Sequence, residues 1–311
     1  MSRIAYFDCF SGIAGDMALG SLLDAGLSLS DLEAGLRSME PLAHEWKIVV
    51  SKVKKGHGQI AATYVQVVSI HGDQGKLDYS LLPEVSEHKH TDTHSHSHSH
   101  SHSHSHGHSH AHGHGHGHSH SHAHDVHDPV QRNFDTIRDL INNATKLPAV
   151  VKSKALDAFT HLARAEASVH GVTMQDIHFH EVGAVDSIID TVGVVLGLYL
   201  LGVDLERGVF CSPIPHSIGY VNTAHGILPC PAPATLQILQ SIPCVPAPPG
   251  ARGELVTPTG ASLVRALCYP NNFGVPPAFV PKGTGIGCGK KEFSGHPNII
   301  RVTLGVPYNH A

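Results

Sequence analysis

Hydrophobic and polar positions in the first seventy residues follow two different spacings. Residues 4–10 form a short apolar and aromatic run that ends in a glycine loop, which is typical of a strand. Residues 16–27 then carry apolar side chains at helical spacing, with Gly26 as a stop. Ser30 and Glu33 match a capping box, which predicts the start of a second short helix.

The next apolar runs alternate with a period of two. Residues 45–53 and 60–70 flank the polar turn KKGHGQ, so they predict a β-hairpin. After Pro129, helical spacing returns over residues 130–145 and over residues 149–171, the second ending at Gly171.

A strongly apolar segment, residues 188–203, follows. It predicts a buried core helix, and it is too short to span a membrane. Asp186, Asp190, Gly193 and Gly197 recur on one face, where the glycines allow close backbone approach.

The rest of the chain has short elements punctuated by proline. Two short helices are expected at residues 233–242 and 260–268, with a final strand at residues 298–306. We therefore predict a mixed α/β (α+β) fold in which a mixed sheet is flanked by helices. Its expected parts are a half at 1–87, a disordered histidine-rich insertion at 88–128, and the second half of the same fold at 129–311.

Composition excludes several classes of protein. The formal net charge is -5 and lysines and arginines form no block longer than two, so we expect no nucleic-acid partner. The N-terminus has no apolar stretch of signal-peptide length, and no segment predicts a membrane span. The six cysteines contain no CxxC pair, which favours a reducing compartment, the cytoplasm. A homo-oligomer is compatible with the sequence.

Histidine occupies every second position from His94 to His124, interleaved with serine, glycine and alanine. Imidazole is a ligand for nickel, copper and zinc, so the run predicts metal loading, although a segment without fixed geometry does not select among these metals. The alternatives are an expression tag or a pH-sensitive solubility segment. The expected ligands include His94, His96, His98, His100, His102 and His104.

The stretch FDCFSGIAGDM places carboxylates and glycines around a predicted strand end. Asp8 ends the strand, Ser11, Gly12 and Gly15 lie in the loop, and Asp16 begins the helix. The arrangement is similar to a phosphate-binding turn but lacks the GKS or GKT of a P-loop. Alternatively, Asp16 is an N-cap and the glycines form turns.

HFHEVGAVDS combines metal-ligand residue types. In an extended segment His178 and His180 point to the same side, and the following helix brings Glu181, Asp186 or Asp190 nearby. This predicts a site with two histidines and one carboxylate. The alternative is a pair of structural histidines with a capping glutamate.

Three later features have weaker signals. His225 is a lone histidine, and Thr257 or Thr259 caps a helix. Glycines alternate before Lys290 in GTGIGCGKK, which fits either a phosphate contact or close strand packing.

Several of these motifs occur together in a known order. FDCFSGIAGDM, HFHEVGAVDSIIDTVG, HGILPCPAPAT, ELVTPTGA and PNIIRVTLG resemble the nickel-insertion proteins of nickel-pincer nucleotide cofactor synthesis, the LarC family. The resemblance implies insertion of Ni(II) into pyridinium-3,5-bisthiocarboxylic acid mononucleotide, with nickel bonds to two sulfurs and a ring carbon. It also implies conversion of CTP to CMP and pyrophosphate with a divalent ion, Mn or Mg.

We assign residue roles on this basis. Asp8, Asp16, Glu181 and Asp186 are expected to be catalytic, and His178, His180 and Asp190 to bind metal. The expected substrate contacts are Ser11, Gly12, Gly15, His225, Thr257, Thr259 and Lys290. Because the chain stops at Ala311, we expect CTP to need a C-terminal module or a partner chain. The competing hypotheses are a non-catalytic nickel store or metallochaperone, and a phosphate-substrate enzyme with a metal-binding tail.

Overall fold

The computed structural model describes residues 2–70, 132–177, 179, 184–268 and 270–308. The strands are β1 Ile4–Asp8, β2 Trp46–Lys55, β3 Ile60–Ser69, β4 Val209–Cys211, β5 Ile214–His216, β6 Tyr220–Thr223, β7 Gly226–Pro229, β8 Cys244–Pro246, β9 Phe279–Cys288 and β10 Ile299–Pro307. The α-helices are α1 Gly15–Asp24, α2 Leu29–Leu36, α3 Phe134–Asn143, α4 Ala149–His170, α5 Val185–Leu200, α6 Pro233–Ile238 and α7 Pro258–Cys268, with a 3₁₀ turn at Leu42–His44.

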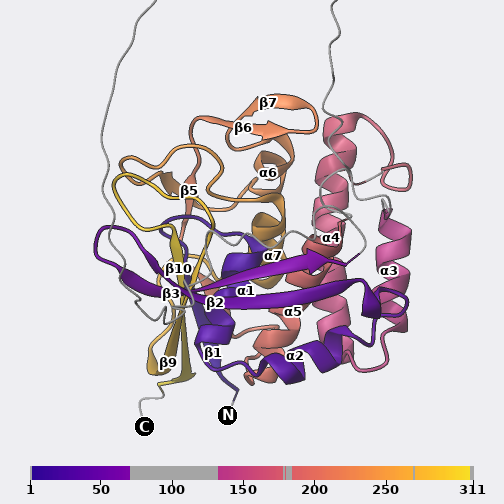
Figure 1. Cartoon of the computed structure of the whole chain (residues 1–311), viewed down its shortest axis with the longest axis horizontal. Coiled ribbons are helices and arrows are strands. Elements are labelled where there is room, and N and C mark those ends of the chain that lie inside the picture. Colours follow the sequence, from indigo (N-terminus) through magenta and orange to yellow (C-terminus); the bar gives the residue numbers. More distant parts are fainter. Residues whose placement is uncertain (1, 71–131, 178, 180–183, 269, 309–311) are drawn as a thin grey trace, which may run out of the picture. The chain divides into compact units, whose positions relative to one another are not determined.

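A mixed sheet joins strands from the two ends of the chain. Within the described residues it has six strands in the order β2-β3-β9-β10-β1-β4. The pairs β3–β9 and β1–β4 are parallel, and the others are antiparallel. Figure 1 shows β2 and β3 as two long neighbouring strands, which is the predicted hairpin. The mixed α/β fold predicted from the sequence is confirmed.

Helix α1 packs directly on β9 because β9 has glycine at alternate positions. A Cβ atom added at Gly287 would lie 1.9 Å from the Met17 carbonyl oxygen, and one at Gly285 would lie 2.0 Å from the Ser21 oxygen. Any side chain there would collide with the helix backbone. These two glycines of GTGIGCGKK therefore serve close strand-to-helix packing, one of the two alternatives that the sequence left open.

Helix α5 forms the centre of the core, as its apolar sequence predicts. Ile188, Val192 and Val195 have no exposed surface. A Cβ at Gly197 would lie 2.7 Å from a Leu27 methyl group, so the glycine face of α5 admits the segment after α1 at close range. This contact holds the C-terminal part of α5 against the segment that follows α1.

Helix caps explain where the flanking helices begin. The Ser28 side chain accepts a hydrogen bond from the Asp31 amide, so Ser28 caps α2 and the predicted capping box at Ser30 was wrong. Both serines precede an acidic residue by three positions, so the pattern alone does not choose between them.

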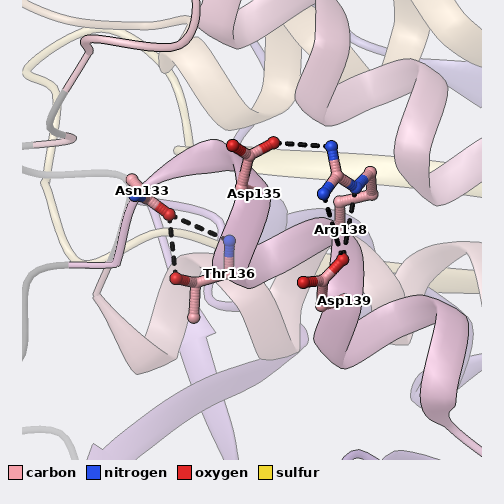
Figure 2. A network of polar contacts seen from close by, with 5 residues as sticks. All are labelled: Asn133, Asp135, Thr136, Arg138 and Asp139. Atoms are coloured by element: carbon pink, nitrogen blue, oxygen red, sulfur yellow. Dashed lines mark hydrogen bonds and ion pairs between the residues drawn. The ribbon is translucent and has the colours of Figure 1, made fainter.

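A side-chain N-cap also begins α3 (Figure 2). Asn133 Oδ1 accepts hydrogen bonds from the Thr136 amide and hydroxyl, at 2.9 and 2.8 Å. Arg138 lies between Asp135 and Asp139 and pairs with both on the helix surface. No helix among the described residues has the length and apolar character needed to cross a membrane.

Candidate functional site

The N-terminal ends of three helices line one cavity of about 410 Å³. Gly15 and Asp16 come from α1, Asp186 and Ser187 from α5, and Pro258 and Thr259 from α7. The first amides of a helix have no partner within the helix, and the N-terminal end carries partial positive charge. The cavity therefore offers several anion-binding positions at once.

Backbone pairing locks α1 and α7 together at this cavity. Ile13 forms a parallel bridge with Val256, in which the Ile13 amide donates to the Leu255 oxygen and the Thr257 amide donates to the Ile13 oxygen. The Thr257 hydroxyl accepts from the Gly260 amide at 3.1 Å, so Thr257 is the cap of α7, and it lies 2.9 Å from the Thr259 hydroxyl. The two threonines thus occupy the rim as a hydroxyl pair.

Three carboxylates from two helices face the same cavity: Asp16, Asp186 and Asp190. Gly15 admits Asp190, since a Cβ at residue 15 would lie 2.7 Å from the Asp190 Cβ. Asp190 Oδ1 is buried and has no hydrogen-bond partner in the described part of the chain. A buried carboxylate oxygen in this state calls for a proton or a cation.

The pKa values of the cavity aspartates also indicate that the cavity favours a proton or a cation. Burial, together with the charge of Asp186, raises the pKa of Asp16 to about 6, although a hydrogen bond from the Met17 amide opposes the shift. Burial, together with the charges of Asp16 and Asp186, raises the pKa of Asp190 well above its usual value. Like charges close together resist joint ionisation, so a bound cation would relieve the cluster.

Asp16 does not cap its own helix. The N-cap of α1 is Ala14, without a side-chain cap, and Asp16 Oδ1 accepts from the next amide, that of Met17, at 2.7 Å. The alternative interpretation of Asp16 as an N-cap was therefore wrong. Its carboxylate lines the cavity instead.

The described residues do not by themselves complete a metal site. Among them, no three His, Cys, Asp or Glu side chains converge tightly enough to hold an ion as they stand. His178, His180 and Glu181, which the sequence assigns to this chemistry, lie outside the described residues, as does the run from His94 to His124. Asp186 and Asp190 follow that segment at the start of α5.

Other residues singled out in the sequence lie away from this cavity. Asp8 pairs with Arg301 at 2.6 Å on the neighbouring strand β10. The buried Ser11 hydroxyl donates to the Pro297 oxygen, and Gly12, with φ of 102°, lies against the Leu255 carbonyl. Lys290 is exposed and does not line the cavity.

His225 belongs to a second, smaller cavity of about 60 Å³. It lies in the β6–β7 turn, and its ring centroid is 4.9 Å from that of His170 at the end of α4. Glu254 and Pro258 line both cavities, so the two adjoin.

Sequence reasoning missed Glu254, Tyr64 and Gln66, which line the larger cavity. Glu254 begins the stretch ELVTPTGA, so its distance of three residues from Thr257 was an available signal. Tyr64 and Gln66 sit on β3 in an ordinary alternating strand pattern, which carries no such signal.

Comparison with known proteins gives a consistent family. The family model described as "Nickel insertion protein" matches residues 5–311. A "Putative nickel insertion protein" from a Geobacter species is 37% identical over 97% of this chain and 61% of its own length. The "Pyridinium-3,5-bisthiocarboxylic acid mononucleotide nickel insertion protein" of Desulfitobacterium hafniense is 36% identical over 97% of this chain and 58% of its own length. The chain thus spans about three fifths of these relatives, and no solved structure matches it.

Proposed function

Since the chain belongs to the nickel insertion protein family, we propose that it inserts Ni(II) into pyridinium-3,5-bisthiocarboxylic acid mononucleotide, the molecule in the name of its Desulfitobacterium relative. Nickel is a substrate of this reaction. The nucleotide offers a phosphate, a cationic ring and two thiocarboxylates, and each needs a different kind of partner.

The observation that carries the proposal is the meeting of three helix N-termini with the carboxylates of Asp16, Asp186 and Asp190 at one cavity. Helix N-termini bind phosphate through amides and dipole, so α7 with its threonine hydroxyls suits the mononucleotide phosphate. Carboxylate oxygens hold a divalent ion, and Asp190 Oδ1 is a buried oxygen in want of such a partner. Phosphate and metal subsites therefore lie within one cavity.

Carboxylate ligands suit a metal ion that the protein has to release to the nucleotide. Nickel binds sulfur ligands more strongly than hard oxygen ligands, so thiocarboxylate sulfurs can displace Asp186 and Asp190 from the ion. Formation of the nickel–carbon bond breaks the ring C–H bond. The electron pair goes to nickel, and the proton goes to a base, for which Asp16 is placed in the cavity wall. No oxidation or reduction is involved.

We extend the proposal to CTP, as the family resemblance implies. Coupled hydrolysis of CTP by water to CMP and pyrophosphate, with Mg(II) or Mn(II), would make insertion effectively irreversible. Measurement of CMP and pyrophosphate release by the purified chain, with and without the nucleotide substrate, tests this extension separately from insertion.

A non-catalytic nickel store is the second candidate, and the run from His94 to His124 favours it. A store needs no cavity in which helix N-termini and carboxylates converge, so the cavity favours the enzyme. A store would bind nickel without changing the nucleotide.

Mass spectrometry of the nucleotide separates the two. The chain is incubated with Ni(II), CTP, Mg(II) and the bisthiocarboxylate nucleotide, and the expected product gains the mass of nickel less the protons lost. Asp190→Asn is expected to abolish the product, whereas Asp139→Asn, at an exposed aspartate of α3, keeps it. Stoichiometric nickel binding with an unchanged nucleotide would support the store.

A further inference from the structure

A second group of metal-ligand side chains lies outside the carboxylate cavity. Glu166 and His170 come from the last turns of α4, and His225 comes from the β6–β7 turn. All three line the smaller cavity, and Figure 1 shows the hairpin beside one end of α4.

The helix sets the first two side chains at the spacing of metal ligands. Glu166 and His170 are four residues apart, so they project from the same face of α4. Glu166 Oε2 and His170 Nε2 are 3.7 Å apart, beyond hydrogen-bond range. Two donors that each lie about 2.1 Å from one ion are roughly 3.0–4.2 Å apart at coordination angles from 90° to 180°, so this pair can share an ion without a change in α4.

His225 supplies a third donor from a separate element, the β6–β7 turn. The Thr223 hydroxyl accepts from the His225 amide at 3.1 Å, which fixes the backbone of the turn. The side chain itself is exposed, and its ring is tilted by 58° to that of His170. Because the three donors do not converge as they stand in the described residues, a rotamer change at His225 has to complete the set. Such a site binds weakly and releases its ion readily.

The position of the group suits transfer to the carboxylates. Glu254 and Pro258 line both cavities, so the two cavities adjoin there. An ion released from the histidines would meet Glu254 next, and then the aspartates at the start of α1 and α5. Neutral imidazoles with one carboxylate favour a borderline divalent ion over Mg(II).

We propose that Glu166, His170 and His225 form a second, lower-affinity site for a divalent transition-metal ion, through which Ni(II) passes to the carboxylate cavity. The passage rests on the proposed function, whereas ion binding at this group does not. Without an ion, Glu166 and His170 are neighbours on one face of α4, and the tilted ring of His225 lies beside them.

Residue-level footprinting tests the site in the whole chain, with the histidine run present. Diethyl pyrocarbonate modifies neutral, accessible histidines, and peptide mass spectrometry reads His225 separately from the run. Free Ni(II) is held by a nitrilotriacetate buffer and raised until the run is saturated. The expected result is loss of His225 modification as Ni(II) rises, with no loss in equal Mg(II).

Variants assign the protection to the three side chains. Glu166→Gln is expected to raise the Ni(II) concentration for half-protection of His225 by about tenfold or more, because removal even of a supporting group costs 10–100-fold at metal sites. His225→Gln, an exposed change on a turn, should cause a similar shift in protection of His170. His161→Gln lies on the same helix outside the group and should cause none. Unchanged His225 modification up to saturating Ni(II), or equal shifts with His161→Gln, would overturn the site.

An insertion assay then tests the passage. His225→Gln is expected to raise the Ni(II) concentration for half-maximal insertion, whereas His161→Gln is not. Footprint protection without any insertion activity would leave the site intact and remove the proposed function. If Ni(II) protects His225 in the footprint but His225→Gln inserts nickel with the wild-type dependence on Ni(II) concentration, the proposed passage of Ni(II) through this site is overturned.

Discussion

The backbone of Gly15 lies against Asp190, so that a Cβ at residue 15 would be 2.7 Å from the Asp190 Cβ and 3.2 Å from its Oδ2. The contact joins the first residue of α1 to the second turn of α5, two segments about 175 residues apart in the sequence. It fixes where the Asp190 carboxylate meets Asp16.

Gly15→Ala is expected to displace the Asp190 side chain while α1 stays helical. Overpacking at such a contact costs about 1–3 kcal/mol in the free energy of unfolding, and insertion activity should fall much further than stability. Activity assays paired with denaturant unfolding check this. Gly58→Ala is the control, because a Cβ there meets nothing within 4 Å. Normal activity in Gly15→Ala would show that the position of Asp190 is unimportant.

Asp16→Asn tests whether the buried charge of the Asp16 carboxylate destabilises the folded chain. The folded state raises the pKa of Asp16 from 3.8 to about 6, so the folded chain holds this proton more tightly than the unfolded chain. The contribution of Asp16 to the free energy of unfolding is therefore fully present below pH 4. It is lost as the pH rises through 6. An asparagine cannot ionise, so the variant should be more stable than the wild type by about 1–3 kcal/mol at pH 7 and by almost nothing at pH 4.

Chemical denaturation at both pH values, without metal, measures this difference. Asp139→Asn, at an exposed aspartate of α3, is the matched control for the removal of one carboxylate. A variant that is less stable than the wild type at pH 7 would mean that the Asp16 charge is already compensated in the folded chain.

Local sequence patterns predicted most elements because those elements are set by near neighbours. The apolar run at 4–10 contains β1, and Gly171 ends α4 with φ of 65°. The predicted glycine face of the core helix is the contact surface of α5. The start of α2 was misplaced, because Ser28 and Ser30 each stand three residues before an acidic side chain.

The site depends on long-range pairing that local patterns do not encode. The sequence suggested Asp8 and Asp16 as a pair at one strand end, yet Asp8 is paired with Arg301 by the register of β1 against β10. Asp16 instead meets Asp186 and Asp190, because glycines in α5 and at residue 15 admit close approach. Packing decided which carboxylates share the cavity.

Gly287→Ala tests the packing role of the glycines in β9. A Cβ would lie 1.9 Å from the Met17 oxygen, a backbone atom of α1 that cannot swing aside, so we expect a loss of about 3 kcal/mol or more in the free energy of unfolding. Gly283→Ala is matched to it on the same strand, where a Cβ meets nothing within 4 Å, and should be neutral or slightly stabilising. If Gly287→Ala kept full stability and lost only substrate affinity, these glycines would be a phosphate contact.

The histidine run supplies nickel, we predict, and does not take part in the chemical step. Its alternating histidine, serine and glycine sequence lacks the apolar residues that hold a reacting centre in fixed geometry. Replacement of residues 88–128 by a serine–glycine linker of equal length should therefore leave kcat unchanged at saturating Ni(II). At scarce nickel the variant should slow markedly, because a tethered store raises the local ion concentration without creating a contact. Insertion rates measured across buffered Ni(II) concentrations provide the test, and loss of kcat at saturation in a folded variant would place the run in the active site.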